Sequence, residues 1–269
     1  VVIWWLMAAD ALQRLQVGLA ARTGLLAAVM VPIAVTLAAG WCDELSIMKE
    51  YANRSDLFAA AIARHIQLVL LALGPTLCIG VPLGWWAYKK QAARQALFPV
   101  LNIIQTIPSI ALFGLLMAPL ALLAAAVPAL AHMGISGVGA APGVIALILY
   151  SLLPVVRGTL AGLEEVPSSV VDAARGMGMS QLQIFLNAEV PLALPVLLAG
   201  VRTAAVQAVG LATVTALIGA GGLGAIMFEG LFSSAHDLVL LGVAPIVTLA
   251  VLTDAAFKIL IRLSSGPRP

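Results

Sequence analysis

Residues 164–191 read EEVPSSVVDAARGMGMSQLQIFLNAEVP, a polar stretch between two long apolar segments. Pro167 suits the first turn of a helix, because the N–H that proline lacks has no intrahelical partner there. Gly178 tolerates the left-handed conformation that closes a helix. Ser180 with Gln183 three residues later is typical of a capping box that opens a second helix. The stretch therefore predicts two short helices in a loop that is large enough for another protein to bind.

The first of these helices has a face of small side chains around Asp172, Ala173 and Ala174, with Val170 and Met177 at helical spacing. Small side chains let the backbone of a partner approach closely. A helix that lies on a membrane surface is richer in Leu, Phe and Lys. We therefore interpret this helix as a docking element, and an amphipathic loop on the membrane surface is the alternative.

The composition is that of an integral membrane protein. Hydrophobic residues make up 62% of the chain and charged residues 10%, against about 25% charged residues in an ordinary soluble domain. The mean hydropathy is +1.09. The net charge of +2 is not gathered into a basic patch, so we expect no nucleic-acid partner. Cys42 and Cys78 have neither metal-binding nor redox spacing, and we expect no metal site.

Charged residues are absent from five windows that are long enough for membrane-crossing helices. One crossing takes about 20 apolar residues, and only a helix satisfies its own backbone in lipid. The window 95–156 is long enough for two crossings, divided at the Gly-rich run 134–139. We therefore predict an all-α helical bundle of about six transmembrane helices. The windows are 23–42, 65–88, 95–156, 203–228 and 238–253.

Basic residues set the expected orientation, because Lys and Arg concentrate at the cytoplasmic ends of transmembrane helices. If the spans alternate, these residues all fall on one side. The loop 164–190 and the C-terminus are then cytoplasmic. The basic residues are Arg14, Arg22, Lys89, Lys90, Arg94, Arg157, Arg175, Lys258, Arg262 and Arg268.

The expected organisation has four parts. Residues 1–22 read as the end of an upstream transmembrane helix, because the chain opens on Val1 with tryptophans typical of a membrane interface. Residues 23–63 hold the first full span and an external segment. Residues 64–263 form the core domain around the loop, and residues 264–269 are a C-terminal tail.

The loop resembles the cytoplasmic "EAA" signature of the membrane subunits of ATP-binding-cassette importers. The matching residues are Asp172-Ala173-Ala174, Gly178 and Val190-Pro191, with Asp in place of Glu and Val in place of Leu. The resemblance runs from about residue 64 onward and is strongest to permeases for glycine betaine, carnitine and choline. The further segments that carry it are NIIQTIPS at 102–109, LLPVVR at 152–157, GVRTA at 200–204 and ALIGAGGLG at 216–224.

The resemblance implies a type I importer fold in which the loop forms a coupling helix seated in a separate ATPase. Carried over by position, the coupling residues are Asp172, Ala173, Ala174, Arg175, Gly178, Met179 and Ser180. The chain has no Gly-x-x-x-x-Gly-Lys-Ser/Thr loop. We therefore expect no enzymatic activity and no bound cofactor in this chain, with ATP and Mg held by the partner ATPase.

The partners that the resemblance implies are two ATPase subunits, a second permease subunit, identical or a sister chain, an external substrate-binding protein and the lipid bilayer. The implied location is the bacterial cytoplasmic (inner) membrane, with several crossings. The implied solute is an osmoprotectant, and a permease for an amino acid or another small solute of the same superfamily is the alternative.

A polar stripe is expected where the solute could pass. Asn102, Gln105, Thr106 and Ser109 are spaced i, i+3, i+4 and i+7, which places them on one face of a helix. Polar groups at membrane depth face protein or water. A translocation path and hydrogen bonds between helices both explain the stripe.

A ridge of alanines at every fourth position follows the loop, and it predicts close helix packing. Arg202, beside the ridge, is expected to pair or to extend to the membrane surface rather than to bind a ligand. The ridge residues are Ala204, Ala208, Ala212 and Ala216.

Three weaker readings remain. Residues 219–224 match Gly-x-Gly-x-x-Gly, but no strand precedes them, and we interpret them as a turn at the external end of a span. The run Gly134-Ile135-Ser136-Gly137 matches rhomboid intramembrane proteases, which require a His on another span. An ion-coupled secondary transporter requires an intramembrane carboxylate, for which Glu229 and Asp254, read as lying near span ends, are the candidates.

Overall fold

The computed structural model describes residues 45–132 and 134–265, and every regular element in these ranges is helical. The predicted all-α class is confirmed. The chain divides into two compact units, Val1–Asn53 and Arg54–Pro269. In the first unit the described residues form the helix α3 (Ser46–Asn53). The expected segment 1–22 and the expected span 23–42 lie outside the described residues.

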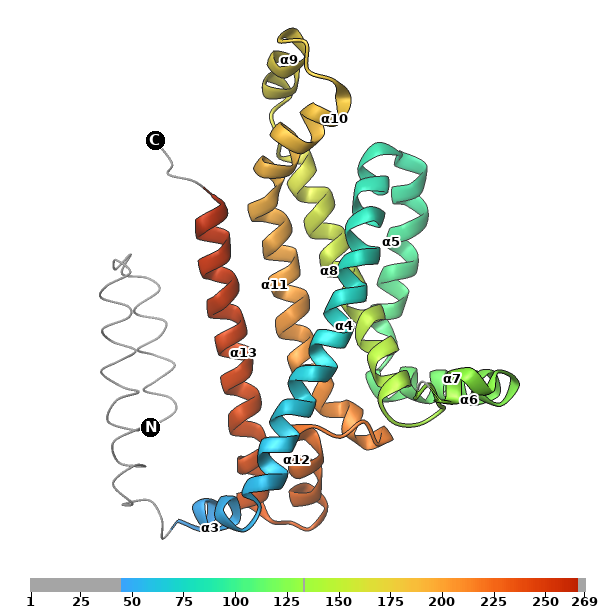
Figure 1. Cartoon of the computed structure of the whole chain (residues 1–269), viewed down its shortest axis with the longest axis vertical. Helices are drawn as coiled ribbons and strands as arrows, with labels where there is room; N and C mark the ends of the chain where they lie inside the picture. Colours follow the sequence, from blue (N-terminus) through green and yellow to red (C-terminus); the bar gives the residue numbers. More distant parts are fainter. Residues whose placement is uncertain (1–44, 133, 266–269) are drawn as a thin grey trace. The chain divides into compact units, whose positions relative to one another are not determined.

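The second unit is a bundle of long helices joined by short helical connections, coloured from blue to red along the sequence in Figure 1. Its elements are α4 (Ser55–Lys89), α5 (Gln91–Thr106), α6 (Ser109–Ala126), α7 (Pro128–His132), α8 (Ala140–Glu164), α9 (Ser168–Gly176), α10 (Gln181–Ile184), the π-helical η1 (Phe185–Glu189), α11 (Val190–Val214), the 3₁₀ helix η2 (Thr215–Ile218), α12 (Leu223–Phe232) and α13 (His236–Ser264).

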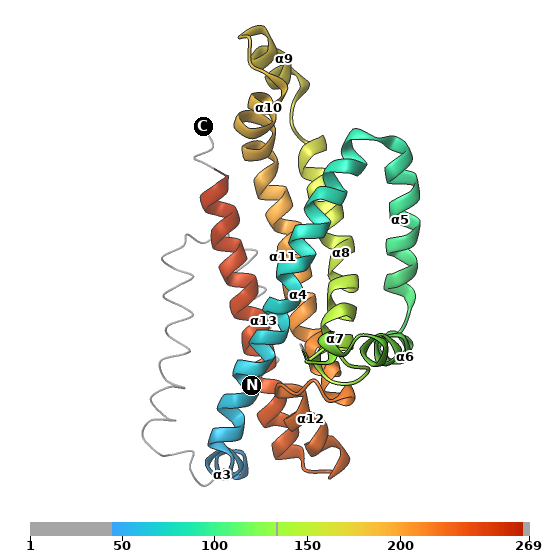
Figure 2. The same cartoon turned by 45° about the vertical axis from the view of Figure 1, so that its right-hand side comes forward.

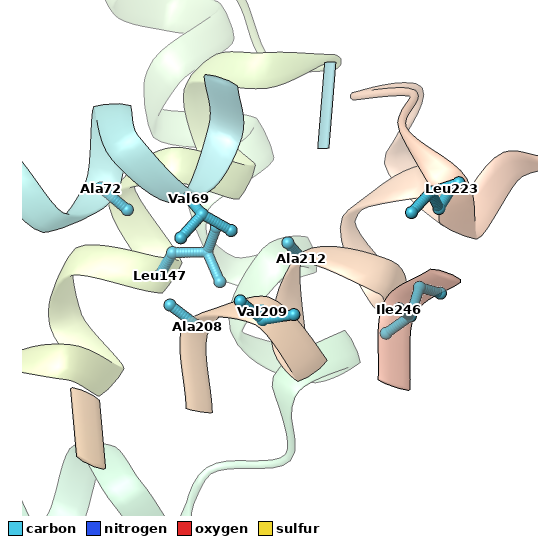
Figure 3. Close-up of a cluster of buried hydrophobic side chains, with 8 residues drawn as sticks. All are labelled: Val69, Ala72, Leu147, Ala208, Val209, Ala212, Leu223 and Ile246. Atoms are coloured by element: carbon cyan, nitrogen blue, oxygen red, sulfur yellow. The ribbon is translucent and has the colours of Figure 1, made fainter. Parts of the chain in front are cut away.

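The helix α8 is the centre of the bundle. It packs along both α4 and α11, and α11 in turn packs on α13. One apolar cluster joins α4, α8, α11, α12 and α13 (Figure 3). Burial of such side chains away from lipid depends on tight packing, because lipid is as apolar as the side chains themselves. The cluster consists of Val69, Ala72, Leu147, Ala208, Val209, Ala212, Leu223 and Ile246.

Glycines allow the central helices to touch backbone to backbone. A methyl group added at Gly158 of α8 would lie 2.7 Å from the Cα atom of Gly200 in α11, and one added at Gly84 of α4 would lie 2.5 Å from the Cβ atom of Thr159. Approaches this close leave no room for any larger residue. Small residues at such crossings are typical of transmembrane helix packing.

Five helical segments of the described residues are long and apolar enough to cross a membrane. Figures 1 and 2 both show α6 lying across the direction of α5 and α8, whereas the shorter α5 runs along the bundle beside α4. The predicted count of about six is therefore not confirmed. The five segments are Ser55–Lys89, Ser109–Ala126, Ala140–Glu164, Gln181–Ile218 and His236–Ser264.

The helix α4 begins at Ser55, ten residues before the window expected from the charge pattern. Its first turns carry charges that find protein partners: Arg54 contacts Glu229 at 2.7 Å, and the Nε atom of Arg64 donates to the Ala220 carbonyl at 3.0 Å. His65, the first residue of the expected window 65–88, is instead fully buried within α4. Charge-free windows therefore underestimate a helix whose charged turns are satisfied by its own bundle.

The window 95–156 is broken in two places. The predicted break before α8 is confirmed, since Gly134 and Gly139 both have φ above +80°. A second break falls at Ile107, which is extended with φ −69° and ψ 127°. Pro108 causes it, because proline disfavours helical conformation in the residue before it and supplies no N–H.

Candidate functional site

The loop 164–190 folds into two short helices, α9 and α10, that extend beyond the ends of α4 and α5 (Figures 1 and 2). The predicted end of the first helix is confirmed: α9 stops at Gly176, and Gly178 has φ +82°. The predicted capping box is also present, with Ser180 Oγ accepting from the Gln183 N–H and the Gln183 side chain accepting from the Ser180 N–H. The local sequence signals therefore specify the shape of the loop.

One face of this loop is an exposed surface of small and apolar residues. Ala174 is 4% exposed and anchors α9, whereas Ala173 beside it is exposed. Met177 is 75% exposed and Leu182 66% exposed. Nothing lies within 4 Å of the position that a side chain at Gly178 would take. The loop thus presents apolar side chains and open backbone together.

The remaining expected coupling residues hold the loop together. Arg175 contacts Asp172 at 3.2 Å on the exposed side of α9. The Met179 N–H donates to the Ala174 carbonyl at 3.2 Å, which closes the turn after α9. All seven expected coupling residues therefore lie in one continuous segment, in which Ala174 is buried and the other six are exposed or partly exposed.

A polar cleft lies between α5, α8 and α11. It is a cavity of about 510 Å³ lined by Gln105 of α5, Arg157 of α8 and Thr203 and Gln207 of α11, among other residues. A second cavity of about 560 Å³ shares Arg157 and is also lined by Asn102. Arg157 therefore lies where the two cavities meet.

Hydrogen bonds connect the polar residues of this cleft. Arg157 donates to Asn102 Oδ1 at 2.8 Å. Gln105 donates to the Tyr150 carbonyl at 2.5 Å and accepts from Gln207 Nε2 at 3.4 Å. The polar side chains of three helices thus form two hydrogen-bonded sets in the lining, one at Arg157 and Asn102 and one at Gln105 and Gln207.

Only two of the four residues of the predicted polar stripe line the cleft. Asn102 and Gln105 of α5 line the two cavities. The Thr106 hydroxyl donates to the Ile103 carbonyl within its own helix. Ser109 begins α6 and does not continue the stripe, because the helix breaks at Pro108. The expectation of one four-residue helical stripe is corrected on this point.

The sequence analysis did not predict Thr203 or Arg157 as cleft residues: Arg157 was used for membrane orientation, and both residues lie in segments that carry the family resemblance. A usable signal was present. Arg157 lies seven residues before the end of α8, which is about 10 Å along the helix from that end at 1.5 Å per residue. An arginine at that depth is more informative than one at a helix end.

The alanine ridge lies against the centre of the bundle. Ala204, Ala208 and Ala212 of α11 are fully buried. Ala216 falls in η2 and is only partly buried, so the regular α-helical ridge ends at Ala212.

Three charged residues of the spans α11 and α13 form ion pairs with one another. The predicted pairing of Arg202 is confirmed, because its Nε atom lies 2.6 Å from Asp254 Oδ1. The Nζ atom of Lys258 lies 2.7 Å from Asp254 Oδ2. Asp254, expected near a span end, lies instead ten residues before the end of α13.

The two weak motifs form turns. Gly219, Gly221 and Gly222 all have positive φ between η2 and α12, so the interpretation of this run as a turn is confirmed. The Ser136 hydroxyl donates to the carbonyl of Val138 two residues later. No group of three or more His, Cys, Asp or Glu residues placed for a metal occurs in residues 45–132 and 134–265.

Comparisons with known proteins agree with this architecture. The family model described as "Binding-protein-dependent transport system inner membrane component" matches residues 79–265. A second model, "ABC transporter permease YehY, N-terminal domain", matches residues 1–48. The Salmonella typhimurium "Osmoprotectant import permease protein OsmW" is 37% identical over 202 residues, which are 75% of this chain and 89% of that protein. The Listeria monocytogenes "Carnitine transport permease protein OpuCB" is 35% identical over 193 residues, covering 72% and 81%.

A solved structure of the inward-facing MetNI methionine ABC transporter superposes with a TM-score of 0.65 at 20% identity, covering 79% of this chain and 98% of that one. This likeness shows a shared fold. The extent of the family match and the identity to permeases that this chain covers over most of their length also show the family. The chain belongs to the family of binding-protein-dependent transport system inner membrane components, and it is the multi-pass inner membrane permease component of an ATP-binding-cassette transporter.

Proposed function

We propose that this chain carries a small quaternary-ammonium osmoprotectant, such as glycine betaine, carnitine or choline, into the cytoplasm. An external binding protein delivers the solute to the outer face. The relatives named as osmoprotectant and carnitine permeases support this solute class, because they match over most of their own lengths. The polar cleft between α5, α8 and α11 is the proposed route, and a second permease subunit, identical or a sister chain, completes it.

The proposed energy source is a pair of separate ATPase subunits that hold ATP and Mg and dock on α9 and α10. The observation that carries this proposal is the exposed surface around Met177, Gly178 and Leu182, which projects from the bundle. Apolar side chains this exposed outside the apolar span of a membrane protein mark an interaction surface. The exposed Ala173 lets the partner approach the helix backbone.

The charge distribution supports a cytoplasmic position for this surface. Lys89 and Lys90 lie at the turn between α4 and α5, and Arg262 lies in the last turn of α13. Both views show these two positions at the same end of the unit as α9 (Figures 1 and 2). Basic residues concentrate at the cytoplasmic side. The loop and the end of α13 are therefore assigned to that side.

The test is the variant Ala173→Glu, with Ala92→Glu as its matched control. Both alanines are exposed, and both lie at the same end of the bundle, Ala92 in the first turn of α5. Neither change affects folding by more than about 0.5 kcal/mol, which is usual for surface substitutions. A carboxylate buried at Ala173 against a partner costs several kcal/mol without a counter-charge.

We expect Ala173→Glu to lose co-purification of the ATPase in mild detergent and to lose ATP-driven uptake of glycine betaine, while Ala92→Glu retains both. Thermal unfolding of the two isolated permease variants should match the wild type. Full uptake by Ala173→Glu would remove the docking role from α9. Uptake driven by an ion gradient with no ATPase present would refute the proposed energy source.

A further inference from the structure

Arg157 is an exposed cation of α8 that lines the cleft, and it forms no ion pair with a carboxylate among the residues that the structure describes. The other two charged residues that line the second cavity, Arg94 and Glu164, form an ion pair at 2.6 Å, and no ion pair of the described residues involves Arg157. At the edge of this cavity, therefore, the charges of Arg94 and Glu164 balance each other. About 10 Å from Glu164 along α8, seven residues earlier in the helix, the charge of Arg157 is not balanced by a carboxylate of the described residues.

The guanidinium of Arg157 is held in place without being saturated. One of its nitrogens donates to Asn102 Oδ1 at 2.8 Å, and its Cζ atom lies 6.0 Å from the centre of the Phe98 ring. A guanidinium has five N–H donors in a planar fork, so most of them remain available to a ligand in the cavities. A planar fork of this kind matches a carboxylate with two parallel hydrogen bonds.

The rest of the cavity lining offers a lone cation no counter-charge. The lining residues of the cavity at Gln105, Thr203 and Gln207 include no Asp or Glu, and Arg157 is the only charged residue among them. In this cavity a solute that is only a cation is therefore repelled by Arg157 and attracted by no carboxylate of the lining. A solute that carries both charges can place its carboxylate on Arg157.

We propose that Arg157, positioned by Asn102, is a carboxylate-binding subsite of the translocation route, and that it makes the permease favour zwitterionic solutes over simple cations. The inference rests on the proposed function, because it assigns a preference within the proposed solute class. Glycine betaine and carnitine carry a carboxylate, whereas choline does not. The subsite therefore favours the first two over the third.

The test uses the complete importer, with its ATPase and binding protein, reconstituted in liposomes. Uptake of glycine betaine, carnitine and choline is measured for the wild type, Arg157→Gln, Arg157→Lys and the control Arg262→Gln. Arg262 is exposed in the last turn of α13, away from the cleft. The binding protein is the same throughout, so a change in the ratio between solutes reports the permease.

We expect Arg157→Gln to lower the uptake ratio of glycine betaine to choline about tenfold or more, the size of one lost hydrogen bond to a charged group. Arg157→Lys keeps the charge without the planar fork of donors, so its uptake ratio should lie between the ratios of the wild type and Arg157→Gln. Arg262→Gln should leave the ratio unchanged. If Arg157→Gln does not assemble with the ATPase, the test depends on Arg157→Lys, whose uptake ratio of glycine betaine to choline must be lower than that of the wild type.

Three results would overturn the proposal. An unchanged ratio in actively transporting variants removes the subsite and leaves the proposed function intact. A loss equal for all three solutes that disappears in liposomes of phosphatidylcholine alone assigns Arg157 to an anionic lipid headgroup. A wild-type importer that takes up none of the three solutes refutes the proposed function and this inference with it.

Discussion

The contact between α8 and α11 predicts opposite effects for the same substitution at two glycines of α11. A methyl group at Gly200 would lie 2.6 Å from the Pro154 carbonyl oxygen and 2.8 Å from the Gly158 Cα atom. Both neighbours are backbone atoms, so the two helices must separate to accept it. At Gly210, in the same helix, no atom lies within 4 Å of the added methyl group.

The magnitudes follow from two competing effects. Alanine gains about 0.5–1 kcal/mol over glycine in a helix interior. Overpacking a close contact costs about 1–3 kcal/mol. Gly200→Ala should therefore lower the free energy of unfolding, by up to about 2.5 kcal/mol, and Gly210→Ala should raise it by about 0.5–1 kcal/mol.

The assay is thermal unfolding of the purified permease in one detergent, where 1 kcal/mol corresponds to about 2–4 °C for a domain of this size. Gly200→Ala should lower Tm by several degrees, and Gly210→Ala should leave it unchanged or raise it slightly. Equal shifts for the two variants, or a higher Tm for Gly200→Ala, would refute the argument that this helix contact requires glycine.

Two further predictions test polar contacts. Asp254→Asn removes the charge that pairs with Arg202 and Lys258 at 2.6 and 2.7 Å. Breaking a fully buried pair costs about 3–5 kcal/mol, but the Asp254 side chain is 27% exposed, so we expect the free energy of unfolding to fall by about 1–3 kcal/mol. The measurement is Tm, which should be lower than that of Asp237→Asn on the same helix. Ser180→Ala removes the cap of α10 at a cost of about 1 kcal/mol, and it should speed hydrogen exchange at the Gln183 amide while α8 exchanges as before; unchanged exchange at Gln183 would show that the cap does not hold α10.

Features that depend on neighbouring residues could be predicted from the sequence. The cap at Ser180 requires only Gln183 three residues later, and the chain reversal at Gly178 requires only a glycine. The charge-free windows overlap the five apolar segments, because lipid excludes charge wherever no partner is present. Their bounds are less exact: the window 203–228, expected to be one crossing, contains the turn 219–222 between η2 and α12.

Features that depend on distant partners could not be predicted in this way. The start of α4 was placed too late because Arg64 is satisfied by the Ala220 carbonyl, 156 residues away. The predicted polar stripe wrongly continued past Pro108 to Ser109, because spacing alone does not show where a helix breaks. Arg157 was read as a marker of orientation because only the folded bundle brings it to Asn102 and to the cleft. A sequence lacks information on which helix faces which.

The π-helical turn at Phe185–Glu189 joins α10 to α11 without a break, so that residues Gln181–Ile218 form one uninterrupted rod. Thr203, at the cleft, is 20 residues from Gln183, which is about 30 Å along the rod. A tilt of about 10° pivoting at either end would sweep the opposite end through about 5 Å, a distance comparable to one helical turn. Such a lever requires no hinge and no chain of rearranging side chains between its two ends.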